Sequence, residues 1–172
     1  METALKILSD EHQNILKMVD RLSEECDSLQ SGDEINIDFF KKTIDFVKGY
    51  VDKFHHAKEE DILFVELCKD EVQMQCNPTQ QMLHEHDLGR DFIKELEKGI
   101  KENNKSKIIE NAKVYSQLLK DHIFKENNIL YPLADEVLSP NIKKNMLERF
   151  KQVEKKLSKE KEKHLLFLKE IK

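Results

Sequence analysis

The chain has 172 residues, a formal net charge of -5, 37% charged residues, and only 4 Gly and 3 Pro. Lys and Glu are interspersed, so there is no basic stripe for a nucleic-acid backbone and no polybasic anchor for lipid headgroups, and we expect neither nucleic acid nor membrane as a partner. No apolar run approaches the roughly 18 residues of a spanning helix, and the charged opening METALKILSDEH does not read as a secretory signal, which predicts a cytoplasmic protein.

The first two predicted elements are long amphipathic helices. Apolar residues recur at steps of three and four from residue 5 until the break at 31–33, and His12 lies on this apolar seam. A second helix is predicted from about residue 38 to residue 69. Its seam includes His55, with Glu59 one turn further along. Both helices therefore direct ionisable groups toward the core.

Three more helices follow. Asn77 and Pro78 provide a cap and a first-turn proline for a third helix, whose seam includes His86. A fourth helix begins near residue 106 and is expected to bend at Pro132. Its seam includes His122 and Glu126. A fifth helix is expected over residues 140–172.

This order predicts an all-α, up-down-up-down four-helix bundle with an additional C-terminal helix. The length fits one domain, with the bundle at 1–138 and the last helix packed outside it or across one end. The 3 cysteines include no CxxC pair, so we expect reduced thiols and no disulfide framework.

The polar residues of the seams predict a metal site. On a helix, residues four apart share a face, so each His-x-x-x-Glu pair supplies two ligands, and one further imidazole comes from each of the other two helices. Buried without partners, these groups would cost several kcal/mol per ionised acid. Imidazoles with carboxylates and no thiolate suit a pair of iron ions better than structural zinc, and leave positions open for a small molecule. The predicted ligands are His12, His55, Glu59, His86, His122 and Glu126.

Other candidates have simpler interpretations. His56 and Glu60 share a face with charged residues, so we expect both in solvent, and the helical position of His84 predicts exposure as well. His164 lies on the apolar stripe of the fifth helix, where packing or a hydrogen bond to a ligand is commoner than ligation. Tyr115 is expected in the core, within reach of a bound ligand as the alternative.

His12 together with the stretches HHAKEEDILF, EHDLGR and HIFKENNILY resembles the hemerythrin-like HHE family over nearly the whole chain. The resemblance implies a four-helix bundle holding a non-haem centre of two Fe ions, with oxo or hydroxo and carboxylate bridges. It also implies metal roles for the same six residues, with Glu59 and Glu126 as the bridging carboxylates. Two positions depart from the oxygen-carrying hemerythrins: Met82 replaces a histidine, and Asn127 stands where those proteins have the acid. The sequence therefore predicts a site poorer in histidine and more open.

The expected function is binding of O2 or NO, or reaction with peroxide, in the response to oxidative or nitrosative stress. The alternatives are an iron donor for the repair of damaged iron-sulfur clusters, a peroxide-consuming di-iron enzyme, and an interaction bundle whose metal is structural. The sequence alone does not decide whether the chain is an enzyme and does not identify its redox partner. We expect a monomer or weak dimer.

Overall fold

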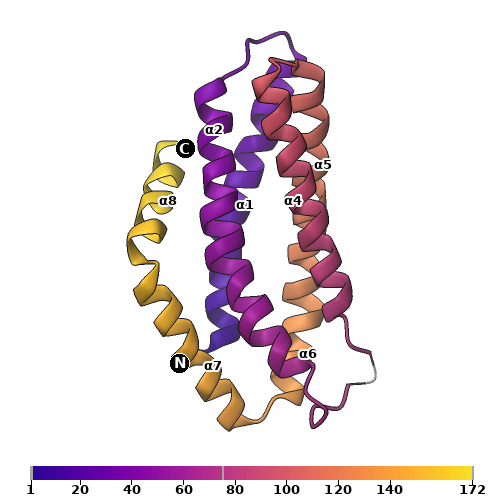
Figure 1. Cartoon of the computed structure of the whole chain (residues 1–172), viewed down its shortest axis with the longest axis vertical. Coiled ribbons are helices and arrows are strands. Elements are labelled where there is room, and N and C mark those ends of the chain that lie inside the picture. Colours follow the sequence, from indigo (N-terminus) through magenta and orange to yellow (C-terminus); the bar gives the residue numbers. More distant parts are fainter. Residues whose placement is uncertain (1, 75, 172) are drawn as a thin grey trace.

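The computed structural model describes residues 2–74 and 76–171, and over these residues the chain is helical with no strand (Figure 1). The first helix, α1 (Ala4–Gln30), begins where the Thr3 side chain accepts a hydrogen bond from the Lys6 backbone N–H. It ends at Ser31, and Gly32 adopts a φ of 114°, which only glycine reaches without strain. The predicted break at 31–33 is confirmed.

The bundle has four long helical segments, called rods below, and α1 is the first. The second rod runs without interruption through α2 (Ile37–Phe46), η1 (Val47–His56), η2 (Glu59–Leu63) and α3 (Phe64–Leu67). Its two η segments are π-helical, so each hydrogen bond spans five residues rather than four and successive side chains turn through a smaller angle. This wider winding changes which residues face the core.

The third rod is α4 (Thr79–Lys101), and the fourth joins α5 (Lys105–Lys125), η3 (Glu126–Leu130) and α6 (Tyr131–Val137). Between these rods, Asn103 takes a φ of 51° and the Asn104 side chain caps α5. The fourth rod also contains a π-helical turn, and Glu126 opens η3 as Glu59 opens η2. The four rods run alternately up and down, which confirms the predicted bundle (Figure 1).

The C-terminal region lies along the outside of the bundle against α1 and the second rod (Figure 1). It forms two helices, α7 (Pro140–Lys156) and α8 (Ser158–Glu170), where the sequence predicted one. The interruption falls at Leu157, whose φ of -106° and ψ of 17° leave the helical region. Residue 172, the last position of the predicted helix, lies outside the described residues.

The apolar core is divided by a polar layer. One cluster of buried apolar side chains spans Ile15 to Leu29 on α1 and continues up the other rods, and the second begins below it at Leu8. The residues that separate the two clusters are ionisable, and they lie at matching levels on all four rods. Among the described residues, no helix is both long enough and apolar enough to cross a bilayer.

Candidate metal centre

Seven buried ionisable side chains meet in the polar layer. One comes from α1, three from the second rod, one from α4 and two from the fourth rod, and none is more than 7% exposed. They are His12, His55, His56, Glu59, His86, His122 and Glu126. The structure thus brings together all six residues singled out in the sequence and adds a seventh.

A first group suited to a cation consists of His12, His55, Glu59 and Glu126, each offering one ligand atom within 4.8 Å of the others. His12 Nε2 lies 3.2 Å from Glu126 Oε2, and His55 Nε2 lies 3.7 Å from Glu59 Oε2. Both imidazoles therefore turn Nε2 toward carboxylates on other turns or other rods.

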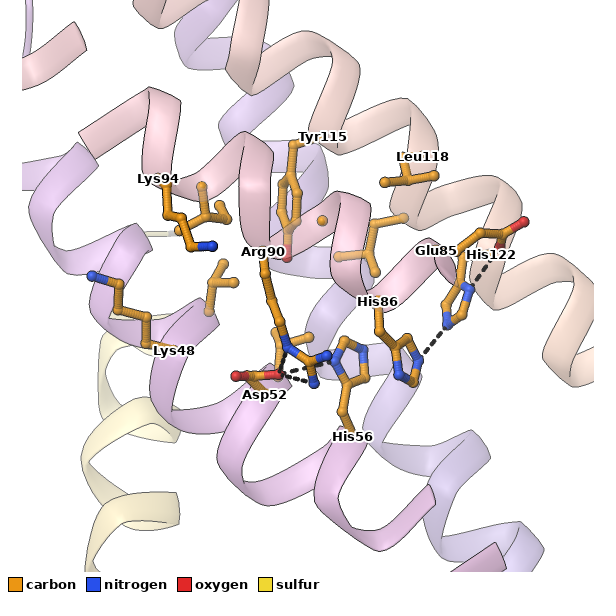
Figure 2. Close-up of a pocket in the computed structure, with 15 residues that line it drawn as sticks. Lys48, Asp52, His56, Glu85, His86, Arg90, Lys94, Tyr115, Leu118 and His122 are labelled. Atoms are coloured by element: carbon orange, nitrogen blue, oxygen red, sulfur yellow. Dashed lines mark hydrogen bonds and ion pairs between the residues drawn. The ribbon is translucent and has the colours of Figure 1, made fainter. Parts of the chain in front are cut away.

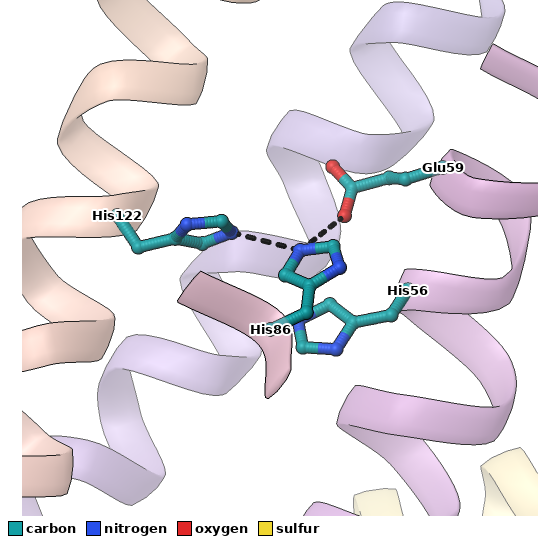
Figure 3. Close-up of side chains that lie close together, drawn as sticks. All are labelled: His56, Glu59, His86 and His122. Carbon is teal, nitrogen blue, oxygen red and sulfur yellow. Dashed lines mark hydrogen bonds and ion pairs between the residues drawn. The ribbon is translucent and has the colours of Figure 1, made fainter. Parts of the chain in front are cut away.

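A second group consists of His56, Glu59, His86 and His122, with ligand atoms again within 4.8 Å of one another (Figure 3). His86 Nε2 lies 3.0 Å from His122 Nε2 and 3.5 Å from Glu59 Oε2. The His56 ring stacks on the His86 ring with centroids 3.7 Å apart. Three imidazoles and one carboxylate thus surround this second position.

The two carboxylates connect the groups. Glu59 belongs to both. Glu126 places Oε2 near His12 of the first group and Oε1 3.1 Å from His122 Nε2 of the second. Two carboxylates whose oxygens face two neighbouring sets of imidazoles form a cluster compatible with metal binding.

The imidazoles are held with one ring nitrogen turned away from the centre. In four of them Nδ1 donates a hydrogen bond to a side-chain oxygen, which leaves the Nε2 lone pair directed inward, as metal-bound histidines require. The pairs are His12 with Asn127 at 2.9 Å, His55 with Glu11 at 2.9 Å, His86 with Glu60 at 2.6 Å, and His122 with Glu85 at 2.8 Å.

The inward-facing atoms fit a cation because they lack other partners. Glu59 Oε2 and both oxygens of Glu126 accept no well-directed hydrogen bond from the described residues. Burial, together with the nearby Glu126 carboxylate, raises the pKa of Glu59 well above its ordinary value. Burial would also raise the pKa of Glu126, but His122 and His12 hold it well below its ordinary value. Cations between these groups would remove the cost of burying unpaired charge and unshared lone pairs.

Without a cation, a proton takes part of this role. Burial alone would lower the pKa of His122, but the carboxylates of Glu126 and Glu85 raise it to about 9. In this protonated form His122 Nε2 carries a hydrogen instead of a lone pair, and it lies 3.0 Å from His86 Nε2 and 3.1 Å from Glu126 Oε1. A metal ion binding here would displace this proton, since histidine ligates in its neutral form.

The repeated H-x-x-K-E motif has a structural explanation. In the first copy, Lys58 donates to Glu11 Oε1, and Glu11 Oε2 accepts from His55 Nδ1. The Lys58 side chain is 0% exposed, and its ammonium lies 3.8 Å from the centroid of the Phe54 ring. A lysine-glutamate pair on the far side of the imidazole thus fixes the orientation of His55.

The second copy builds the same chain of contacts. Lys125 donates to Glu85 Oε1, and Glu85 Oε2 accepts from His122 Nδ1. Here the lysine is 29% exposed, because α7 and α8 lie against the other side of the bundle. The glutamates come from the two Glu-His dipeptides at 11–12 and 85–86, so each lysine of one rod pairs with an acid of another.

The prediction that His56 and Glu60 lie in solvent is wrong. His56 is 7% exposed. The Glu60 side chain is 24% exposed, and it accepts hydrogen bonds from His86 Nδ1 and from Arg90 at 2.7 Å. The prediction assumed α-helical rotation, whereas the π-helical winding of η1 and η2 turns both His55 and His56 inward. His56 thus places in the polar layer an imidazole that the sequence did not predict there.

The remaining candidates lie as follows. His84 is exposed, as predicted. His164 is buried against Phe46 and Gly49, away from the polar layer. Tyr131, which sequence reasoning overlooked, donates to Glu59 Oε1 at 2.5 Å and stacks on His12 with centroids 5.5 Å apart. The sequence feature that could have identified Tyr131 is its position as the aromatic residue at the end of the repeated motif, in HIFKENNILY.

The fold and the polar layer together define a helical bundle with a buried histidine-carboxylate cluster compatible with metal binding. The model of the Hemerythrin HHE cation binding domain matches residues 3–134. The chain therefore belongs to the hemerythrin HHE cation-binding family. Comparison with curated proteins found no match.

Proposed function

We propose that the chain holds two iron ions in the polar layer and binds O2 or NO, or reacts with peroxide, in the response to oxidative or nitrosative stress. The observation that carries the proposal is the orientation of the histidines. Four imidazoles use Nδ1 to donate to side-chain oxygens and direct Nε2 toward two shared carboxylates. Hydrogen bonding of the outer ring nitrogen fixes the ligating tautomer.

In this proposal His12 and His55 hold the first ion, and His56, His86 and His122 hold the second. Glu59 and Glu126 are shared between the two. The first ion would have four protein ligands and the second five, fewer than the six of octahedral coordination, so positions remain for an exogenous molecule. When bound, the iron pair supplies redox-active positions for small ligands.

The surrounding residues orient the ligands through hydrogen bonds. Tyr131 donates to Glu59, which supports the ionised form of a carboxylate that burial would otherwise protonate. Glu11 and Glu85 favour the ligating tautomer of His55 and His122. These contacts hold the ligands in place before iron arrives, which lowers the entropic cost of binding it.

The test is metal analysis of the purified protein, together with its visible and near-ultraviolet spectra under argon, O2, NO and peroxide. Two irons per chain and a spectrum that changes with at least one of these molecules are the expected results. Protein reconstituted with iron that retains none, or whose spectrum ignores all three molecules, would overturn the proposal.

Donation of iron to damaged iron-sulfur clusters is the alternative. It requires iron that leaves the protein readily, whereas every proposed ligand is buried. We therefore expect bound iron to exchange slowly with a chelator. Rapid loss to the chelator, with recovery of a damaged cluster enzyme in the same mixture, would favour the donor role.

A further inference from the structure

A pocket of about 220 Å³ lies beside the second group, between η1, α4 and α5 (Figure 2). The imidazoles of His56, His86 and His122 line it, whereas His12 and His55 of the first group do not. The rest of the wall is mainly apolar, with Val47, Val51, Ile93, Leu118 and Leu119. The pocket therefore joins an apolar space to one side of the polar layer.

The charged residues of the wall are already engaged. Arg90 donates to Asp52 at 2.8 Å and to Glu60 at 2.7 Å. Lys48 pairs with Glu97 at 2.8 Å and Lys94 with Asp91 at 2.9 Å. Each of these cations already has a carboxylate partner, so the wall presents no unpaired cation to a ligand and favours a neutral molecule.

Besides His56 Nδ1, which has no hydrogen-bond partner among the described residues, the wall contains the hydroxyl of Tyr115. Tyr115 is 3% exposed, and its hydroxyl bonds to none of the described residues. Figure 2 shows the hydroxyl end of the ring directed into the space beside Arg90. A Cβ at Gly89 would lie 3.5 Å from the Tyr115 ring, in ordinary van der Waals contact, so a longer side chain at this position would extend into the space beside the ring.

The volume of the pocket and the apolar nature of its wall indicate which kind of ligand it can bind. An apolar cavity of about 150 Å³ stays dry and binds benzene, because a water molecule needs several polar partners. This pocket is larger than that and far larger than a diatomic gas requires. Within the described part of the chain, its unpartnered polar atoms are the Tyr115 hydroxyl and His56 Nδ1, whereas an ordered water typically makes about three hydrogen bonds.

We propose that this pocket binds a neutral, mostly apolar organic molecule of about five to seven heavy atoms, with Tyr115 donating a hydrogen bond to its polar atom. Small ketones and alkyl hydroperoxides belong to this chemical class. The inference extends the proposed function by adding an organic ligand beside the second group, and its readout does not depend on any reaction of iron.

The experiment measures binding of cyclopentane and cyclopentanone to the purified full chain by calorimetry and by the rise in melting temperature. The two probes have similar size, and only the ketone accepts a hydrogen bond. Gly89→Leu fills the pocket from α4, and Tyr115→Phe removes only the hydroxyl. Val114→Leu adds a methylene group to an outward-facing position on α5 that is 42% exposed, and serves as the control.

Wild type and the control should bind both probes, and Gly89→Leu should bind neither while keeping its iron and helical content. Tyr115→Phe should bind cyclopentane unchanged and cyclopentanone about three- to ten-fold more weakly, the usual effect of one neutral hydrogen bond. Failure of wild type to bind either probe, or binding by Gly89→Leu equal to wild type, would overturn the proposal. Equal ketone affinity in Tyr115→Phe would overturn the role of the hydroxyl. Binding of both probes by a protein whose spectrum ignores O2, NO and peroxide would refute the proposed function alone.

Discussion

The contacts Lys58–Glu11–His55 and Lys125–Glu85–His122 lead to a quantitative prediction, because the two sets contain the same residue types but differ in how deeply the lysine is buried. Glu11→Gln removes the negative charge beside Lys58, which is 0% exposed, while keeping the size of the side chain and an oxygen for His55. Glu85→Gln makes the same change beside Lys125, which is 29% exposed.

The structure sets different magnitudes for these two substitutions. Removing one partner of a buried ion pair costs about 3–5 kcal/mol, and the oxygen retained by Gln favours the lower end of that range for Glu11→Gln. The second pair is partly exposed, with Lys125 29% and Glu85 9% exposed, so solvent screens it more than the first and Glu85→Gln should cost about 1 kcal/mol. At about 2–4 °C per kcal/mol for a chain of this size, Glu11→Gln should lower the melting temperature by roughly 6–12 °C. Glu85→Gln should lower it by a few degrees at most.

Thermal unfolding followed by circular dichroism, with and without iron, checks this difference. A second comparison separates charge from packing: Glu11→Gln combined with Lys58→Met should recover most of the lost stability, because an uncharged pair of similar volume leaves no isolated charge. Equal destabilisation by the two single substitutions would refute the reasoning from burial. So would a double substitution no more stable than Glu11→Gln alone.

Three further outcomes are expected. His56→Ala should reduce the iron content and alter the spectrum of the remaining iron, whereas His84→Ala, at an exposed position, should leave metal analysis unchanged; equal iron content in both variants would remove His56 from the site. Glu59→Ala should empty both positions, because its carboxylate belongs to both groups; retention of two irons would contradict sharing. Gly49→Ala should lower the free energy of unfolding, measured with denaturant, by about 1–3 kcal/mol, because the new Cβ would lie 2.1 Å from His164 Nε2 on α8. Unchanged stability would show that α8 packs loosely against η1.

Much of the architecture follows from local pattern. The steps of three and four in the apolar residues act within one helix, so the sequence predicted the helices and their approximate ends. The caps at Thr3, Asn104 and Ser139 are findings of the structure. The same periodicity placed His12 and His86 on inward faces. Pairing of residues four apart identified both His-x-x-x-Glu sets, and the structure brings all of these groups into one layer.

The sequence by itself therefore determined the helical bundle and the inward direction of six polar groups, because each depends on the rotation from one residue to the next along a single helix. Tertiary structure decided the contacts between rods. Lys58 reaches Glu11 and Tyr131 reaches Glu59 across the bundle, and no spacing along the chain encodes such pairs. It also decided the burial of His56, since π-helical winding turns that side chain inward, and a rule based on α-helical rotation assigns it to solvent.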